Sequence, residues 1–274
     1  MTQPEPAPGS KCGAGGPQTA GRVVLLAGPD ESTNVVANYL DSRVRDLVLV
    51  VESGPSRVRM ARRRARRVGW VDAAGQILFV ALAQPVLRRT SKQRRESIRK
   101  TASVDTRRRA PDFAVSSVNE ERTISLLSEL RPSVVVVHGT RIIGTPLLEA
   151  LDCPVVNVHA GITPRYRGVH GGYWALAEDH PEWVGTTVHL VDPGIDTGGI
   201  LAQVTFPITD ADSIGTYADL HLIHGLPLLA TQVEKVLAGE VLEPVATSVA
   251  SGSFLRYHPT LWGYFRLRRS SGVR

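Results

Sequence analysis

Residues 155–168, VVNVHAGITPRYRG, contain two polar side chains that could act together on one substrate. The first five residues read as an apolar β-strand, in which Asn157 and His159 project from the same face. The glycines and Pro164 that follow force the chain into a shaped loop. A carboxamide beside an imidazole suits a reaction in which a carbonyl carbon becomes tetrahedral and its oxygen gains negative charge.

A carboxylate is expected to complete this pair. A histidine that stabilises an oxyanion acts best when protonated, and a nearby carboxylate raises its pKa. The loop VDPGIDTGG, residues 191–199, supplies Asp196, and its glycines give it the freedom to fold back over the site. We therefore expect Asp196 to lie beside His159.

The elements that must position these residues alternate between strand and helix. Apolar runs at 22–28 and 46–53 enclose a helical pattern, which is the strand, helix, strand unit of a parallel sheet. An amphipathic helix at 121–133 leads into a strongly apolar run at 134–144. Because ligands bind at the carboxyl ends of strands in open parallel sheets, Asn157 and His159 are expected at such an edge.

The second half of the chain shows two further patterns. Residues 185–208 read as two antiparallel strands around a Gly-rich loop. Residues 213–237 read as a long helix, which Gly225 and Pro227 are expected to bend or restart.

The formal charge of +6 is unevenly distributed along the 274 residues. Residues 51–110 hold 17 Lys and Arg against 4 acids, and the remainder holds 15 basic and 22 acidic residues. The basic residues gather in two stretches of helical pattern, which predict an insertion at about 55–112. A solvated helical face, an anionic membrane surface, a phosphorylated substrate or nucleic acid would each suit such charge. Nucleic acid is not expected, because the stretches lack interleaved aromatics.

The two cysteines, Cys12 and Cys153, offer neither a disulfide framework nor a metal-type spacing, which indicates a reducing cytoplasm. Residues 1–20 are rich in Pro and Gly and lack the apolar core of a signal peptide, so a disordered tail is expected. No later run approaches the roughly 20 apolar residues of a membrane span. We therefore expect a cytoplasmic protein without a membrane span, whose oligomeric state no pattern reveals.

Two segments, VVNVHAGITPRYRGVHGGYWAL and GTTVHLVDPGIDTGGILAQ, resemble the 10-formyltetrahydrofolate-dependent formyltransferases. This family includes glycinamide ribonucleotide, methionyl-tRNA and sugar N-formyltransferases. It has an Asn-x-His strand, a Pro-x-Tyr-Arg-Gly loop and a later Asp-x-Gly loop; here Asn157 and Asp196 are 39 residues apart. The resemblance covers residues 120–207. It implies a Rossmann-like α/β fold with a mostly parallel central sheet and helices on both faces.

The resemblance also implies roles for individual residues. A substrate amine would attack the formyl carbon of 10-formyltetrahydrofolate. Asn157 and protonated His159 would stabilise the oxyanion, while Asp196 would keep His159 charged and relay a proton. No metal is implied. His189 and His138 are expected to pack or to support the site, with His138 an alternative substrate contact. Folate contacts are expected from Arg141, Ile142, Ile143, Val191, Asp192, Gly194 and Ile195, and substrate contacts from Tyr166, Arg167, Gly168 and His170.

The acceptor amine is less clearly indicated. Glycinamide ribonucleotide formyltransferases hold a phosphate on a short Gly-Ser-Asn turn, whereas GPDESTNVV carries Asp30 and Glu31, which would repel phosphate. Ser32 is expected instead to cap the following helix. Methionyl-tRNA formyltransferases carry a C-terminal β-barrel, whereas the residues after 208 begin with a long helix. An amino sugar nucleotide or a specialised-metabolite amine is therefore expected, since a diphosphate would suit the basic insertion.

Three other functions stay open on the sequence: a 10-formyltetrahydrofolate hydrolase, an enzyme like glycinamide ribonucleotide formyltransferase, and a folate-binding module without turnover. The hydrolases carry an N-terminal regulatory domain, for which residues 1–20 leave no room. We expect a formyltransferase that acts on a small-molecule amine. Its catalytic domain is expected at 21–208, with the insertion at 55–112 and a C-terminal helix and extension at 209–274.

Overall fold

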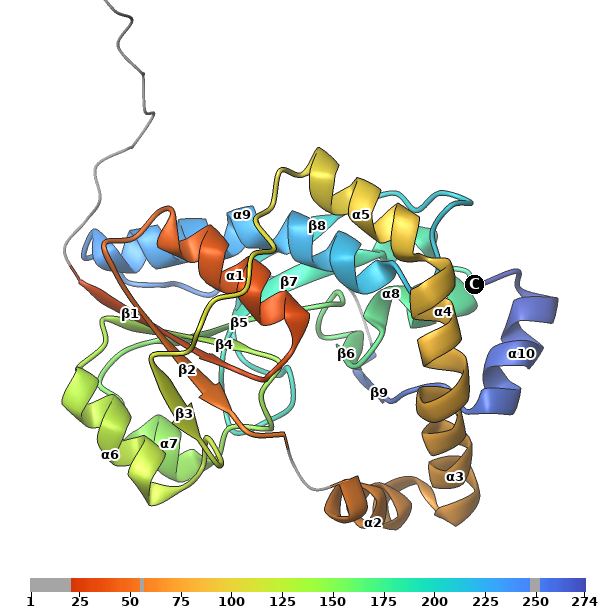
Figure 1. Ribbon diagram of the computed structural model, residues 1–274, viewed down its shortest axis with the longest axis horizontal. Helices are drawn as coiled ribbons and strands as arrows, with labels where there is room; N and C mark the ends of the chain where they lie inside the picture. Colours follow the sequence, from red (N-terminus) through yellow and green to blue (C-terminus); the bar gives the residue numbers. More distant parts are fainter. Residues whose placement is uncertain (1–20, 55–56, 247–251) are drawn as a thin grey trace, which may run out of the picture.

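The computed structural model describes residues 21–54, 57–246 and 252–274, and the predicted tail with Cys12 lies outside them (Figure 1). A seven-stranded sheet has the order β3-β2-β1-β4-β5-β7-β8. The first five strands in that order are parallel, and β7 is antiparallel to both of its neighbours. This confirms the predicted mostly parallel α/β fold. The strands are β1 (Arg22–Ala27), β2 (Asp46–Glu52), β3 (Phe113–Val115), β4 (Val134–His138), β5 (Val155–His159), β7 (Gly185–Leu190) and β8 (Ile200–Thr205).

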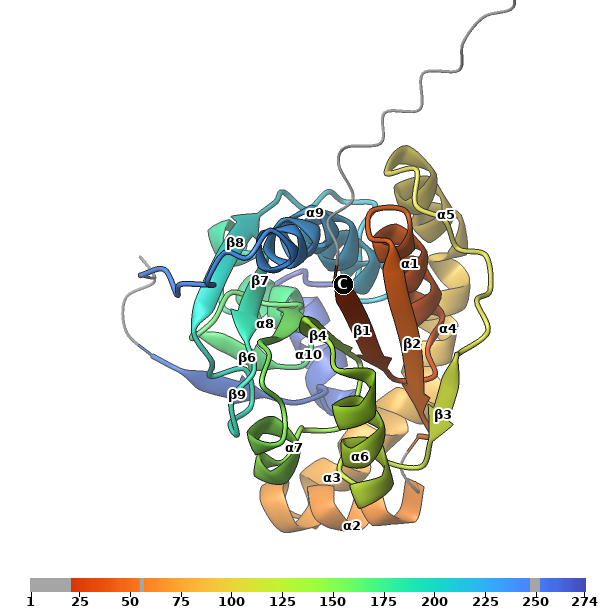
Figure 2. The same ribbon diagram turned by 90° about the vertical axis from the view of Figure 1, so that its left-hand side faces the viewer.

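Helices cover both faces of this sheet, as expected for strands that are apolar on both sides (Figure 2). Alternate residues of β1 show the division. Val23 and Leu25 belong to a core shared with α1 (Glu31–Asp41) and α9 (Tyr217–Leu237). Val24 and Leu26 belong to a second core, formed with α6 (Glu121–Leu130) and α7 (Thr145–Glu149).

Helix α9 is continuous, although a bend or restart was predicted at Gly225 and Pro227. Gly225 is required by close packing rather than by a turn, since a Cβ there would lie 2.6 Å from a methyl group of Val158 on β5. Leu226 and Leu229 are fully buried in the core beside β1. The predicted boundary at 208 therefore does not divide the core, because α9 forms one of the layers that cover the sheet.

The basic insertion is helical, as predicted, and it packs back onto the rest of the molecule (Figure 1). Phe79 is fully buried, with its ring centroid 5.4 Å from that of Tyr264 near the C-terminus. The insertion consists of α2 (Arg57–Val68), α3 (Trp70–Leu78), the π-helical η1 (Phe79–Ala83), α4 (Gln84–Thr90) and α5 (Lys92–Thr101). The remaining elements are β6 (Tyr166–Gly168), which pairs with β9 (Phe254–Arg256), α8 (Gly171–Ala177), the 3-10 turn η2 (Pro181–Trp183) and α10 (Leu261–Ser270).

Much of the basic charge of α5 is neutralised inside the protein. Arg95 and Arg99 both bind Asp219 of α9, at 2.7 and 2.6 Å, and Arg94 binds Asp212 at 2.8 Å. Both carboxylates are buried. The prediction of a merely solvated basic face is therefore wrong for this helix, which docks on acidic residues of the C-terminal half.

One stretch of the described chain, Trp70–Thr90, is long and apolar enough to cross a membrane by length and composition. Only 22% of its most apolar window is buried in the protein. No apolar run of this length was expected from the sequence, because Gly75, Gln76, Gln84 and Pro85 interrupt the apolar residues.

Candidate active site

A cavity of about 430 Å³ lies at the carboxyl ends of β4 and β5, where the parallel part of the sheet meets antiparallel β7. This is the edge at which open α/β sheets bind ligands. Asn157, His159 and Asp196 all line it. The seven residues expected to contact folate line it as well: Arg141, Ile142, Ile143, Val191, Asp192, Gly194 and Ile195.

The loop between β7 and β8 brings Asp196 next to the strand residues. One carboxylate oxygen, Oδ2, lies 3.4 Å from Nδ1 of His159 and accepts a hydrogen bond from the backbone N–H of Gly168 at 2.8 Å. Asp196 has a positive φ of 51°, a conformation that an aspartate tolerates better than most residues. Two segments 39 positions apart in sequence thus form one polar cluster.

Burial and charge act in opposite directions on the ionisation of this cluster. Burial lowers the pKa of His159, and the opposing effects of Asp196 and of the Tyr166 carbonyl do not reverse the shift. Burial alone would raise the pKa of Asp196, but His189, His159 and the N–H of Gly168 outweigh it, so this pKa is lowered. Asp196 is therefore a carboxylate, and the protonated state expected for His159 stays a prediction.

Hydrogen bonding identifies the tautomer of His159. Its Nε2 lies 2.7 Å from the backbone oxygen of Tyr166, and since a carbonyl only accepts, Nε2 carries the hydrogen. Nδ1 faces the carboxylate of Asp196. A proton on Nδ1 forms an ion pair with that carboxylate.

His189 contacts Asn157, as a residue that supports the site would. The two residues face each other across β5 and β7. Nδ1 of His189 donates to the backbone oxygen of Leu190 at 2.6 Å, and its Nε2 lies 3.1 Å from the Asn157 amide nitrogen and 3.6 Å from Oδ1 of Asp196. The amide orientation is thereby fixed, and one N–H of Asn157 remains for a ligand.

A buried carboxylate at the end of β2 anchors the loop after β4, and the sequence analysis did not identify it. Glu52 is 2% exposed and accepts from the backbone N–H groups of Arg141 and Val118, at 2.5 and 3.1 Å. It also pairs with the Arg141 guanidinium at 2.7 Å. The sequence could have revealed Glu52, because it is an acidic residue at the end of an apolar strand.

Three of the residues expected to contact substrate do not line the cavity, although Gly168 does. Tyr166 is fully buried, and its hydroxyl donates to Glu178. Arg167 donates to the backbone oxygen of Ile195 and so braces the Asp196 loop. His170 bonds to His258 at 2.9 Å. Each of these three side chains therefore makes at least one hydrogen bond within the protein, outside the cavity wall.

Ser32 and His138 also lie in surroundings that differ from those expected. Ser32 does not cap α1, because Asp30 occupies the N-cap position. The Ser32 hydroxyl instead lies 2.9 Å from Nε2 of His138. Burial lowers the pKa of His138 to about 4, so this histidine is neutral.

Two arginines of the cavity wall were not predicted. Arg67, at the end of α2, and Arg256, on β9, come from the insertion and the C-terminal segment. The side-chain Nε of Arg256 is buried without a hydrogen-bond partner among the described residues, while its terminal nitrogen binds Glu178. Only the tertiary structure brings these distant segments to the site.

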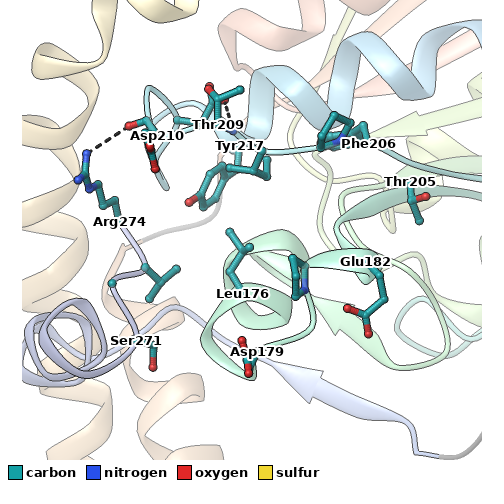
Figure 3. Close-up of a pocket in the computed structure, with 16 residues that line it drawn as sticks. Leu176, Asp179, Glu182, Thr205, Phe206, Thr209, Asp210, Tyr217, Ser271 and Arg274 are labelled. Carbon is teal, nitrogen blue, oxygen red and sulfur yellow. Dashed lines mark hydrogen bonds between the residues drawn. The ribbon is translucent and has the colours of Figure 1, made fainter.

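A second cavity of about 610 Å³ lies between η2, the start of α9 and the last four residues (Figure 3). Arg274 donates there to the backbone oxygen of Asp210 at 3.2 Å. Its wall contains neither Asn157, His159 nor Asp196. Although this cavity is larger, the smaller one holds the polar cluster and is the candidate active site.

Comparison with protein families and with curated proteins finds similarity to formyltransferases. A family model described as formyl transferase matches residues 47–223. A methionyl-tRNA formyltransferase of Pelotomaculum thermopropionicum is 33% identical over 135 residues, which cover 49% of this chain and 42% of that protein. One from Anaeromyxobacter dehalogenans is 31% identical over 190 residues, covering 68% of this chain and 59% of that protein. The chain thus matches only about two fifths to three fifths of the length of these relatives.

Solved structures share the fold at lower identity. A phosphoribosylglycinamide formyltransferase from Anaplasma phagocytophilum has a TM-score of 0.53 at 16% identity, covering 80% of this chain and 87% of that one. An N-formyltransferase from Helicobacter canadensis, in complex with folinic acid and dTDP-3-aminofucose, has a TM-score of 0.51 at 15% identity. Its match covers 86% of this chain and 71% of that one.

Proposed function

Because the chain belongs to the formyl transferase family, we propose that it transfers a formyl group from 10-formyltetrahydrofolate to a primary amine. The observation that carries the proposal is the cluster of Asn157, His159 and Asp196 in one cavity, with His159 Nδ1 3.4 Å from the Asp196 carboxylate. The loops at 141–143 and 191–195 line the same cavity and would receive the pterin ring. The donor supplies an activated one-carbon acyl group.

The proposed chemistry follows from the charges of the cluster. As the amine nitrogen bonds to the formyl carbon, the free N–H of Asn157 stabilises the developing oxyanion. The proton that the amine loses passes to Nδ1 of His159, where Asp196 stabilises the new imidazolium. That proton then returns to the departing folate nitrogen as the carbon–nitrogen bond breaks. The lowered pKa of His159 suits this sequence, because the histidine must accept a proton and then donate it.

We propose that the acceptor carries phosphate, as an amino sugar nucleotide does. Arg67 supplies positive charge to the cavity wall, and Arg256 lines the same wall with its guanidinium paired to Glu178. Glu31 does not add to the case against a ribonucleotide at the turn after β1, because Arg95 and Arg99 neutralise its charge. The Helicobacter canadensis protein, whose structure contains dTDP-3-aminofucose, is consistent with this substrate class.

Methionyl-tRNA is a second candidate acceptor. The two curated relatives described above carry that name. The same arginines would contact a tRNA phosphate backbone, in which case catalysis would weaken steeply with salt.

An acceptor screen tests the proposal. Purified protein is mixed with 10-formyltetrahydrofolate and, separately, nucleotide-linked amino sugars, glycinamide ribonucleotide, amino acids and methionyl-tRNA, and loss of the folate formyl group is followed. We expect turnover with a phosphorylated small amine. Release of formate without any amine would instead identify a hydrolase, and folate binding without turnover across the panel would identify a binding module.

Neighbouring arginines of α2 provide a matched test of the substrate class. Arg67→Met should raise KM for a phosphorylated amine about tenfold, because a charge-assisted hydrogen bond is lost. Arg66→Met is the control, since this exposed arginine does not line the cavity. An equal effect of the two substitutions would contradict a specific phosphate contact and leave formyl transfer itself intact.

A further inference from the structure

Exposed apolar side chains are concentrated on one surface of this protein. Of the 14 exposed large hydrophobic side chains among the described residues, eight lie on the helical stretch 70–90 and on α10. The surfaces of soluble proteins rarely carry so many exposed apolar residues close together, so this concentration indicates a binding surface. The eight residues, named here the apolar face, are Trp70, Val71, Ile77, Leu78, Leu82, Val86, Trp262 and Phe265.

The apolar face is continuous along the helix axis. Residues 70, 74, 78, 82 and 86 recur at a spacing of four and are all exposed apolar residues. Trp70 is 74% exposed and Leu82 57%. The opposite side of the same stretch is anchored in the protein by Ala73 and by Phe79, so the exposed residues do not await internal packing.

Helix α10 extends this surface sideways (Figure 1). A Cβ on Gly75 would come within 2.4 Å of the Trp262 ring, so α3 and α10 pack in direct contact there. A groove of about 470 Å³ separates the two helical segments further along, lined by Leu82, Val86 and Phe265 among others. Two aromatic side chains, Trp262 at 48% and Phe265 at 54% exposure, project beside it.

Basic residues surround the apolar face at both ends. Arg66 and Arg67 precede it, Arg89 follows it on α4, and Arg269 ends α10. Asp72 is the one acidic residue within 70–90 and 261–270, all of which the structure describes. A partner for this surface must therefore be apolar at its centre and anionic at its rim.

We propose that the apolar face and its arginines bind the surface of an anionic lipid bilayer, with the helix lying in the interface rather than spanning it. Exposed Trp, Phe and Leu enter the boundary between headgroups and acyl chains, while Arg binds lipid phosphates. The chain does not span the bilayer through this stretch, because its inner side belongs to the folded core. This property goes beyond formyl transfer and does not depend on it.

Charge argues against a second copy of the chain as the occupant. In a two-fold contact, both copies would present the same basic rim. Antiparallel pairing would place Arg66 and Arg67 of one copy near Arg89 of the other, and like charges across an interface are unfavourable. An anionic membrane has the complementary charge.

Vesicle flotation tests the proposal. The full chain is mixed with vesicles of phosphatidylcholine, or of equal parts phosphatidylcholine and phosphatidylglycerol. We expect binding to the anionic vesicles that falls with added salt, and weak binding to the neutral ones. The variant Leu82→Ser with Val86→Ser should weaken binding at least about tenfold, through lost apolar burial. The variant Arg89→Glu with Arg269→Glu should weaken it at least about fivefold for each arginine.

Matched controls lie on other surfaces. Val241→Ser with Val245→Ser changes two exposed valines, and Arg122→Glu with Lys235→Glu changes two exposed cations; neither pair should alter binding. Circular dichroism melting confirms that each variant folds. Absent or equal binding to both kinds of vesicle would overturn the proposal. So would light scattering that shows a dimer which Leu82→Ser with Val86→Ser converts to monomer.

Discussion

At the scale of the residue, each member of the Asn157, His159 and Asp196 cluster depends on a partner behind it. His189 orients the amide, the Tyr166 carbonyl holds Nε2–H of His159, and the backbone N–H of Gly168 binds the carboxylate. These contacts are made before substrate arrives. The cluster is therefore preorganised, which is the condition under which dipoles lower a barrier effectively.

Alanine substitution should test the cluster directly. Asn157→Ala removes a donor to the oxyanion and should lower kcat about 100-fold to 1,000-fold. His159→Ala and Asp196→Ala should cause losses at least as large, because the proton then lacks its route. Folate affinity, measured by equilibrium titration, should change little. Near-normal turnover by His159→Ala would contradict its assigned role.

His189 provides a test of positioning rather than of chemistry. His189→Leu should lower kcat about tenfold with little change in KM, because Asn157 loses its acceptor and reorients. His189→Gln offers an amide oxygen as acceptor and should restore part of the rate. If the Leu and Gln variants were equally impaired, a packing role alone would explain His189.

At the scale of the element, the insertion is held in place by charge as well as by its apolar core. Asp219 of α9 binds two arginines of α5, and Asp212 binds a third. Residues 51–110 carry a net charge of +13 (17 − 4) and the remaining residues −7 (15 − 22). These opposite charges partly neutralise each other where α5 meets the C-terminal part of the chain. A basic stretch that resembles a ligand surface in the sequence is here partly an internal interface.

Removing this internal charge pairing should be costly. Asp219→Asn removes the buried carboxylate shared by Arg95 and Arg99 and leaves them only the more exposed Glu31, so it should lower the free energy of unfolding by about 2 kcal/mol. Chemical denaturation measures the change. Asp105→Asn is the control, because its partner Arg107 is 88% exposed, and it should change stability little. Equal effects of the two substitutions would show that α5 is not held by buried charge.

At the scale of the whole molecule, buried neutral histidines link stability to pH. His221 of α9 is 3% exposed, and burial lowers its pKa from 6.5 to about 3. The unfolded chain therefore binds a proton that the folded chain does not. The stability that His221 contributes is complete above about pH 6.5 and is lost as pH falls toward the folded pKa.

The free energy of unfolding should therefore decrease by about 2 kcal/mol for His221 alone between about pH 7.5 and pH 5. His221→Gln should show a smaller decrease over the same range. The carboxylates with lowered pKa, such as Asp212, titrate mainly below this window, since their ordinary value is near 3.8. Urea denaturation at the two pH values measures the difference, and identical decreases in both proteins would rule out His221 as the source.

Local patterns in the sequence were sufficient for the alternation of strands and helices and for the pairing of Asn157 with His159 on one face, whereas the loops that line the candidate site were expected from the family resemblance. These features follow from the period of a strand and from glycine positions, which depend on neighbouring residues alone. The tertiary structure decided what depends on distance through space: His189 behind Asn157, Arg67 and Arg256 at the cavity, and the pairing of α5 with α9. It also sets the pKa of His159, which burial in the folded core lowers against the attraction of the nearby carboxylate.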